Sequence, residues 1–146
     1  MTKADNARCS LKIHTIVFLM EKQADRILQQ QLELTFSQFL ILSAISQNPG
    51  LSQSKIAHRR NLTNAAVSKQ IDTLLRRSLI DRQRHPQSRR EYILLLTRSG
   101  EKTVHQARQI TDQVFEDIFG VLTGQQRQNF ENSLTKLLGS FDSSPA

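Results

Sequence analysis

Residues 51–77 read LSQSKIAHRRNLTNAAVSKQIDTLLRR, and this stretch decides the fold. Ser52 stands where it can cap a short helix, and Asn61 can end that helix because asparagine tolerates the left-handed conformation. Thr63 can cap a second helix, in which apolar residues recur on one face. The apolar positions of the second helix are Val67, Ile71, Leu74 and Leu75. Two short helices joined by a turn of about three residues form a helix-turn-helix pattern.

Positive charge is concentrated around this motif. The chain of 146 residues carries 20 Lys and Arg against 13 Asp and Glu, a net charge of +7. Between Pro49 and Gly100 there are 11 cations and 3 anions, so this segment carries +8 and the rest of the chain carries −1. Such a balance favours a polyanionic partner, and its position beside a helix-turn-helix favours DNA over an acidic membrane face.

A change of pattern after the motif predicts a β-hairpin. Two β-rich segments, LIDRQR at 79–84 and EYILLLT at 91–97, flank the sequence HPQS. Pro86 imposes a turn or extended geometry between them. A hairpin beside a helix-turn-helix is a wing, and arginines at its tip can lie along phosphates or enter the minor groove. The side chains expected to pack onto the helices are Tyr92, Leu94 and Leu96, or the alternate set.

Apolar residues at helical spacing predict a long helix before this lobe. Its stripe runs from Ile13 to Leu28, with apolar residues three and four positions apart. Phe18 and Leu19 make the stripe wider than one core contact requires. The excess of apolar surface indicates that this helix has a second surface to cover.

Capping signals mark three further helices. Thr35 and Gln38 form a capping box for a helix that the sequence NPG ends. Thr97 opens a helix that continues to about Gly120, and TGQQ from Thr123 is another capping box. The apolar positions of the last helix are Phe130, Leu134, Leu137, Leu138 and Phe141.

The order of these segments resembles the MarR family of winged-helix transcriptional regulators. The resemblance spans roughly residues 11–141 and rests on LTFSQFLILSAI, PGLSQSKIA, NLTNAAVSKQIDTLLRRSLIDRQ and LLLTRSGEK, with the basic hairpin before the last of these. It implies one mainly α domain with a small β-hairpin over 1–146. Within it, a winged helix-turn-helix DNA-binding lobe occupies 35–100, and a helical dimerisation region occupies 10–33 and 101–141. It further implies a homodimeric repressor that binds a near-palindromic operator and is often released by a small ligand or by oxidation.

The resemblance also assigns DNA contacts by position. The base-facing residues of the recognition helix are Thr63, Asn64, Ala65, Ser68 and Lys69. The residues of the supporting helix near the DNA backbone are Ser52, Ser54 and Lys55. The wing arginines are Arg82, Arg84, Arg89 and Arg90, of which the last matches the arginine that enters the minor groove. Two positions depart from the family pattern: Ser88 replaces an Asp that would orient the guanidinium of Arg90, and Ser78 replaces a Gly that commonly precedes the wing.

Redox, metal and catalytic roles have weaker support. Arg8 and Lys12 are close enough in sequence to lower the pKa of Cys9, but ARCSLK differs from the oxidant-sensing signature of some relatives, so an inert thiol is favoured. The histidines, which are His14, His58, His85 and His105, are scattered. We therefore expect no metal and no other cofactor. The sequence shows no phosphate loop, no paired-carboxylate motif and no nucleophile placed beside a base, so it does not predict an enzyme.

The expected location is the cytoplasm, because the chain has a single cysteine, no signal-peptide pattern and no apolar run of about 20 residues. Two functions remain open. One is a dimeric, sequence-specific regulator, with oxidant sensing through Cys9 as a variant. The other is a sequence-tolerant architectural DNA-binding protein that uses the same charge without reading bases. A protein-interaction module that has lost DNA binding is disfavoured by the charge retained in the wing.

Overall fold

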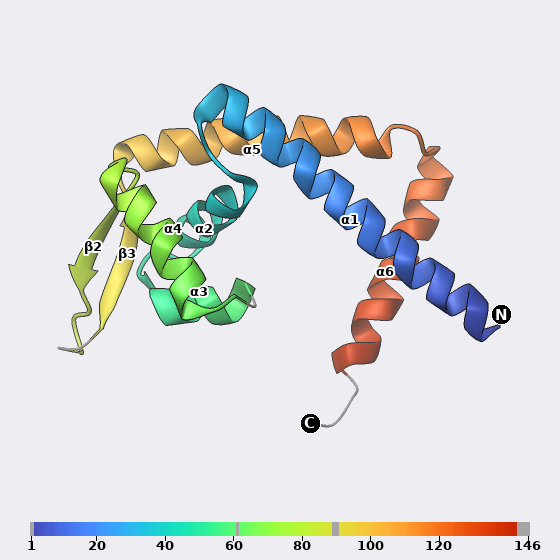
Figure 1. Ribbon diagram of the computed structural model, residues 1–146, viewed down its shortest axis with the longest axis horizontal. Helices are drawn as coiled ribbons and strands as arrows, with labels where there is room; N and C mark the ends of the chain where they lie inside the picture. The colour runs from blue at the N-terminus through green and yellow to red at the C-terminus, as the bar shows by residue number, and fades with distance from the viewer. Residues whose placement is uncertain (1, 61, 89–90, 143–146) are drawn as a thin grey trace. The chain divides into compact units, whose positions relative to one another are not determined.

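The computed structural model describes residues 2–60, 62–88 and 91–142. The chain divides into two compact units, Met1–Thr111 and Asp112–Ala146, and the division falls within the fifth helix. The described residues are mainly helical with a small antiparallel sheet, as the sequence predicts (Figure 1). In chain order the elements are α1 (Lys3–Leu32), α2 (Phe36–Gln47), β1 (Leu51–Ser52), α3 (Gln53–Arg60), α4 (Asn64–Arg76), β2 (Ile80–Arg84), β3 (Tyr92–Leu96), α5 (Arg98–Phe119) and α6 (Gly124–Asp142).

The predicted helix-turn-helix is formed by α3 and α4, which bury their apolar faces. The buried residues of the two helices are Ile56, Ala57, Val67, Ile71 and Leu74. Thr63 caps α4 as predicted, because its Oγ1 accepts a hydrogen bond from the Ala66 N–H at 3.1 Å. The α3 helix ends at Arg60. Asn61, which we expected to end this helix, lies outside the described residues.

The α2 helix lies at the centre of the core of the first unit. Its capping box is confirmed: the Thr35 N–H donates to Gln38 Oε1 at 3.0 Å, and the Gln38 N–H donates to Thr35 Oγ1 at 3.1 Å. Asp25 of α1 accepts a hydrogen bond from the Phe36 N–H at 2.9 Å, which joins α1 to the start of α2. The residues that α2 buries are Phe39, Ile41, Leu42 and Ile45. A helix that buries so many positions stabilises the lobe from within.

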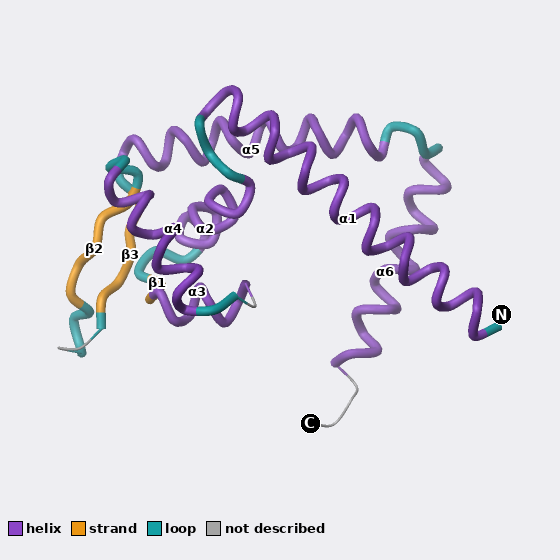
Figure 2. Tube along the Cα trace, viewed as in Figure 1, coloured by secondary structure: helices purple, strands orange, loops and turns teal. Residues whose placement is uncertain are grey.

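The sheet contains the predicted hairpin and one strand that the sequence did not predict. Its order is β1-β3-β2, and all neighbours are antiparallel. Leu51 of β1 pairs with Leu94 of β3, and the Gly50 N–H donates to the Leu94 carbonyl at 3.1 Å. Gly50 has a φ of +90°, which a residue with a side chain rarely adopts. Figure 2 shows β1 as a very short strand next to α3. A strand of two residues is too short to show an alternating apolar pattern in the sequence. Only its pairing with β3, far along the chain, defines β1.

Ser78, which departs from the family pattern before the wing, has a left-handed backbone conformation. It lies between α4 and β2 with a φ of 54°, in the left-handed region that favours glycine. Its carbonyl accepts a hydrogen bond from Thr97 Oγ1 at 2.7 Å, and the same Oγ1 accepts from the Gly100 N–H at 3.0 Å. Thr97 therefore caps α5, as predicted, and also fixes the turn before the wing.

Replacing Ser78 with Gly should stabilise the protein by about 1 kcal/mol, because glycine removes the cost of the left-handed conformation. The Ser78 side chain is exposed, so the substitution removes no buried contact. Urea unfolding at equilibrium measures the change. The matched control is S133G in α6, where glycine in a helix should lower stability instead. A Ser78→Gly protein that is no more stable than the wild type would contradict the strain.

The N-terminal helix begins earlier than the stripe from Ile13 to Leu28 indicates. Thr2 and Asp5 form a capping box, so α1 starts at Lys3. Hydrogen bonds from the Thr2 backbone N–H and hydroxyl, and from Arg8, hold the pKa of Asp5 below its ordinary value. Of the predicted stripe, Ala24 and Leu28 are buried. The large apolar side chains exposed on this helix are Leu11, Ile13, Ile16, Val17, Phe18 and Leu19.

The second unit contains the end of α5 and all of α6. Thr123 caps α6 in the predicted box, with the Thr123 N–H 2.9 Å from Gln126 Oε1. Arg127 Nη1 donates to Glu116 Oε1 at 3.0 Å, which joins the two helices. The exposed large apolar residues of this unit are Val121, Phe130, Leu137, Leu138 and Phe141. Nowhere in the described chain is a helix both long enough and apolar enough to cross a membrane.

Candidate nucleic-acid interface

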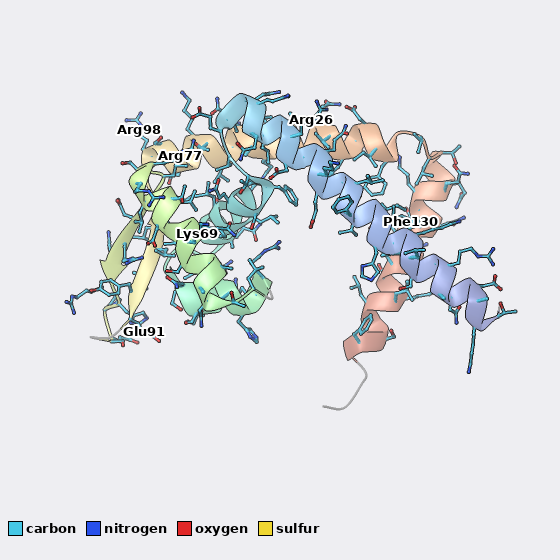
Figure 3. The ribbon with its side chains drawn as sticks, in the orientation of Figure 1. Arg26, Lys69, Arg77, Glu91, Arg98 and Phe130 are labelled. Atoms are coloured by element: carbon cyan, nitrogen blue, oxygen red, sulfur yellow. The ribbon has the colours of Figure 1, made fainter. Side chains whose placement is uncertain are left out.

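One face of α4 carries the predicted recognition residues. Thr63, Asn64 and Ala65 are exposed at the N-terminal end of the helix, Lys69 is exposed one turn later, and Ser68 is half-buried. Figure 3 shows Lys69 on α4. The opposite face of the helix is held in the core by the buried side chain of Val67 and those that follow it at helical spacing. The burial pattern therefore fixes which side of α4 faces solvent.

The supporting residues at the start of α3 differ in exposure. Ser54 and Lys55 are exposed, whereas Ser52 is buried. The Ser52 hydroxyl accepts a hydrogen bond from the Lys55 N–H at 3.4 Å and lies 3.2 Å from Ser54 Oγ. Ser52 thus caps α3, as predicted, and orients the exposed Ser54. The Ser52 hydroxyl is used in hydrogen bonds within the protein. The exposed groups at the start of α3 are the side chains of Ser54 and Lys55.

Gln53 connects the two helices of the motif and was not among the predicted site residues. Its Nε2 donates to the backbone carbonyl of Asn64 at 3.3 Å. Asn64 is the first residue of α4, so this bond fixes the start of α4 relative to the start of α3. The sequence contains no signal for it, because a glutamine at the beginning of a helix is common and its partner is an ordinary backbone carbonyl.

The described part of the wing presents two arginines against one aromatic ring. Arg82 pairs with Leu94 and Arg84 with Tyr92 across the hairpin. Both guanidinium groups lie 5.7 Å from the centroid of the Tyr92 ring, a cation–π distance. Arg82 also lies 3.8 Å from a carboxylate oxygen of Asp72 on α4, so it bridges the wing and α4.

The inward-facing set of the hairpin differs in part from the prediction. Leu94 is buried and Leu96 is half-buried, as expected for the set that packs onto the helices. Tyr92 belongs to the same set but is 44% exposed, because its ring supports the two arginines at the end of the hairpin where β2 ends and β3 begins. Arg89 and Arg90, the predicted tip arginines, lie outside the described residues.

These elements surround a shallow cavity of about 320 Å³ on the face formed by α3, α4 and the wing. Its lining residues are Ser52, Gln53, Ser54, Asn64, Arg82, Glu91, Tyr92 and Leu94. Figure 3 shows Glu91 at the end of the hairpin where β2 ends and β3 begins. The lining therefore combines hydrogen-bonding groups at two helix starts with one cation and one anion, which suits a polar, charged partner better than an apolar one.

Comparison with known proteins identifies this arrangement. The model of the MarR family matches residues 34–92, from the start of α2 into β3. MepR, a transcription regulator of the Staphylococcus aureus multidrug efflux pump MepA, is 30% identical, and the match covers 90% of this chain and 97% of MepR with a TM-score of 0.72. The chain belongs to the MarR family.

Other proteins agree with the assignment to the MarR family. The transcriptional regulator HosA of Escherichia coli O111:H- is 26% identical over 127 residues, which are 87% of this chain and 94% of HosA. A second MepR structure, a complex with DNA, is 29% identical and covers 90% of this chain and 95% of MepR with a TM-score of 0.75. BldR of Sulfolobus solfataricus is 23% identical over 96% of this chain and 99% of its own, and its TM-score of 0.83 shows the shared fold.

The redox and metal candidates of this MarR-family chain are distributed over several elements. Cys9 is an exposed free thiol on α1, and a redox role for it stays a prediction. In the part of the chain that the structure describes, no three His, Cys, Asp or Glu side chains come together as metal ligands.

Proposed function

We propose that the protein is a homodimeric, sequence-specific regulator of transcription, a repressor that acts in the cytoplasm and binds a near-palindromic operator. In this proposal Asn64, Ala65 and Lys69 of α4 read bases in the major groove, with Thr63 and Ser68 beside them. Ser54 and Lys55 bind the backbone, with Ser52 orienting them. The arginines assigned to the wing contact are Arg82, Arg84, Arg89 and Arg90.

The observation that carries this proposal is the exposed N-terminal half of α4 beside a cationic wing. Small polar side chains and one lysine at that end can enter a major groove, whose width admits a helix. Arg82 and Arg84 add positive charge on the wing beside α4, where it can meet a phosphate or the minor groove. The similarity to MepR, which has been solved as a complex with DNA, supports DNA as the partner.

A homodimer is supported by the apolar surface of the terminal helices. The side chains of Leu11 and Phe18 are 68% and 62% exposed, and Leu138 and Phe141 in the second unit are 67% and 76% exposed. Exposed apolar surface of this extent is typical of a protein–protein interface. A second copy of the chain offers the same helices, so a symmetric dimer buries both sets at once.

A small effector is supported by a groove of about 450 Å³ in the first unit, a volume in the range of ligand pockets. Its lining residues are Phe18, Glu21, Lys22, Asp25, Phe36, Ser37, Leu40, Arg60 and Leu62. It joins α1 and α2 to the end of α3. A molecule bound there touches both the proposed dimerisation helix and the helix-turn-helix, so it could shift one against the other.

The experiment that tests the proposed function is a fluorescence-anisotropy titration at several salt concentrations. The probes are the duplex that the wild-type protein selects from a random library and a scrambled version of it. We expect a preference of about 10³-fold or more for the selected duplex at physiological salt. Equal, steeply salt-dependent binding to both duplexes would contradict sequence-specific regulation and favour the architectural alternative.

Within this assay, replacing Tyr92 with Leu should weaken binding of the selected duplex about fivefold, because Arg82 and Arg84 lose the ring that orients them. The slope of affinity against salt should stay unchanged, since no cation is removed. Y92F is the matched control, because it keeps the ring, and it should bind like the wild type. Equal losses in both variants would instead assign the effect to the Tyr92 hydroxyl.

A further inference from the structure

Arg77 connects α4, the proposed recognition helix, to the C-terminal end of α1. It is the C-cap residue of α4, and its N–H donates to the Thr73 carbonyl at 3.1 Å. Its guanidinium turns to α1, where Nη1 donates to the Glu33 carbonyl at 2.6 Å and Nη2 donates to the Leu32 carbonyl at 2.9 Å. Figure 3 shows Arg77 at this end of α4. One side chain thus holds two successive carbonyls on another helix.

The end of α1 requires such a partner. A helix leaves its last carbonyls without partners and concentrates partial negative charge there. Glu33 ends α1 in the left-handed conformation, with a φ of 51°, and the last turn of α1 contains no basic residue of its own. The planar fork of an arginine suits two neighbouring acceptors, and hydrogen bonds from a charged donor are stronger than neutral ones. Arg77 supplies the cation that the last turn of α1 lacks.

The same junction also includes the start of α5. Ser78 follows Arg77 directly, and Thr97, the cap of α5, donates its hydroxyl hydrogen bond to the Ser78 carbonyl. Two adjacent residues therefore tie together the end of α1, the end of α4 and the start of α5. The exposed apolar part of α1, around Leu11 and Phe18, belongs to the same continuous helix. A displacement of α1 reaches α4 through the Arg77 hydrogen bonds.

We propose that Arg77 is a positioning residue that sets the spacing of the two recognition helices on DNA by fixing α4 against α1. This inference rests on the proposed function, in which α1 packs in the dimer and α4 reads DNA. The Arg77 guanidinium is engaged by α1, so its charge serves the geometry of the protein and not a phosphate. Its neighbour Arg76 is exposed on α4 and donates only within the helix among the bonds described, to Thr73 Oγ1 at 3.1 Å.

The test compares spacing discrimination in two variants. Three duplexes are used: the one selected by the wild-type protein, the same duplex with one base pair inserted between its half-sites, and a single half-site. An inserted pair moves one half-site by about 3.4 Å and rotates it by about 35°, so the wild type should bind it about tenfold or more weakly. R77A should lose most of this discrimination while it binds the half-site like the wild type.

R76A is the matched control, because it removes the same charge one position away, and it should keep the discrimination. R77K keeps the charge but has a single donor nitrogen in place of the fork, so it should restore only part of the discrimination. A purely electrostatic role for Arg77 predicts full restoration instead. If R77A discriminates as strongly as the wild type, or binds all three duplexes equally more weakly, the positioning role is wrong. A wild type without spacing preference would contradict the proposed dimeric function itself. Thermal melts show whether each variant is folded, and R77K provides the comparison if R77A is not.

Discussion

Replacing Gly100 with Ala should destabilise the protein by about 3 kcal/mol, the upper range for a side chain forced into a packed site. A Cβ added at Gly100 would lie 1.9 Å from the backbone oxygen of Leu79 and 3.0 Å from its carbonyl carbon. The same oxygen accepts a hydrogen bond from the Thr97 N–H at 3.1 Å, which joins the cap of α5 to the residue before β2. The backbones at Gly100 and Leu79 cannot move apart without breaking that hydrogen bond.

The sign of this effect separates packing from helix propensity. Gly100 lies in the first turn of α5, where alanine alone would favour the helix by up to about 1 kcal/mol. The matched control is G139A in α6, where an added Cβ meets nothing within 4 Å, and there the favourable propensity should remain. Equilibrium urea unfolding of the three proteins measures both changes. A G100A protein as stable as the wild type would contradict the close approach of α5 to Leu79.

The features that could be predicted from the sequence are those that a few neighbouring residues determine. The caps at Thr35, Thr63 and Thr123 were predicted because each hydroxyl meets an amide three positions away. The outward face of α4 follows from the periodic burial of Val67 and Ile71 in the same way. The early start of α1 was missed because the apolar stripe, and not the capping box before it, was taken as the sign of the helix.

The features that escaped prediction depend on partners far along the chain. β1 exists because Leu94 pairs with Leu51, and neither residue identifies the other. Arg77 counted as one more cation of the basic segment, yet its guanidinium binds carbonyls at the end of α1. Net charge therefore predicts a class of partner but does not show which arginines are free to face it. The exposure of Tyr92 has the same origin, since two arginines on the opposite strand hold its ring.

Replacing Lys69 with Ala should weaken binding of the selected duplex by about 5- to 150-fold, the cost of losing one good base contact of about 1–3 kcal/mol. Lys69 is exposed on the outward face of α4, one turn beyond Asn64, where a recognition helix meets base edges. The scrambled duplex should lose far less, because a base contact contributes little to non-specific binding. Anisotropy titrations on both duplexes measure the ratio of the two affinities, which is the quantity that base reading controls.

Two companion variants separate base reading from charge. N64A changes no charge, so a selective loss on the selected duplex with an unchanged salt dependence can come only from a lost directional contact. R76A removes an exposed cation at the other end of α4, and it should leave the ratio of affinities unchanged. If K69A instead weakens both duplexes equally and lowers the salt slope by about one, then Lys69 binds a phosphate. The reading of bases would then depend on Asn64 and its neighbours. If N64A also binds both duplexes like the wild type, neither residue tested on α4 reads bases.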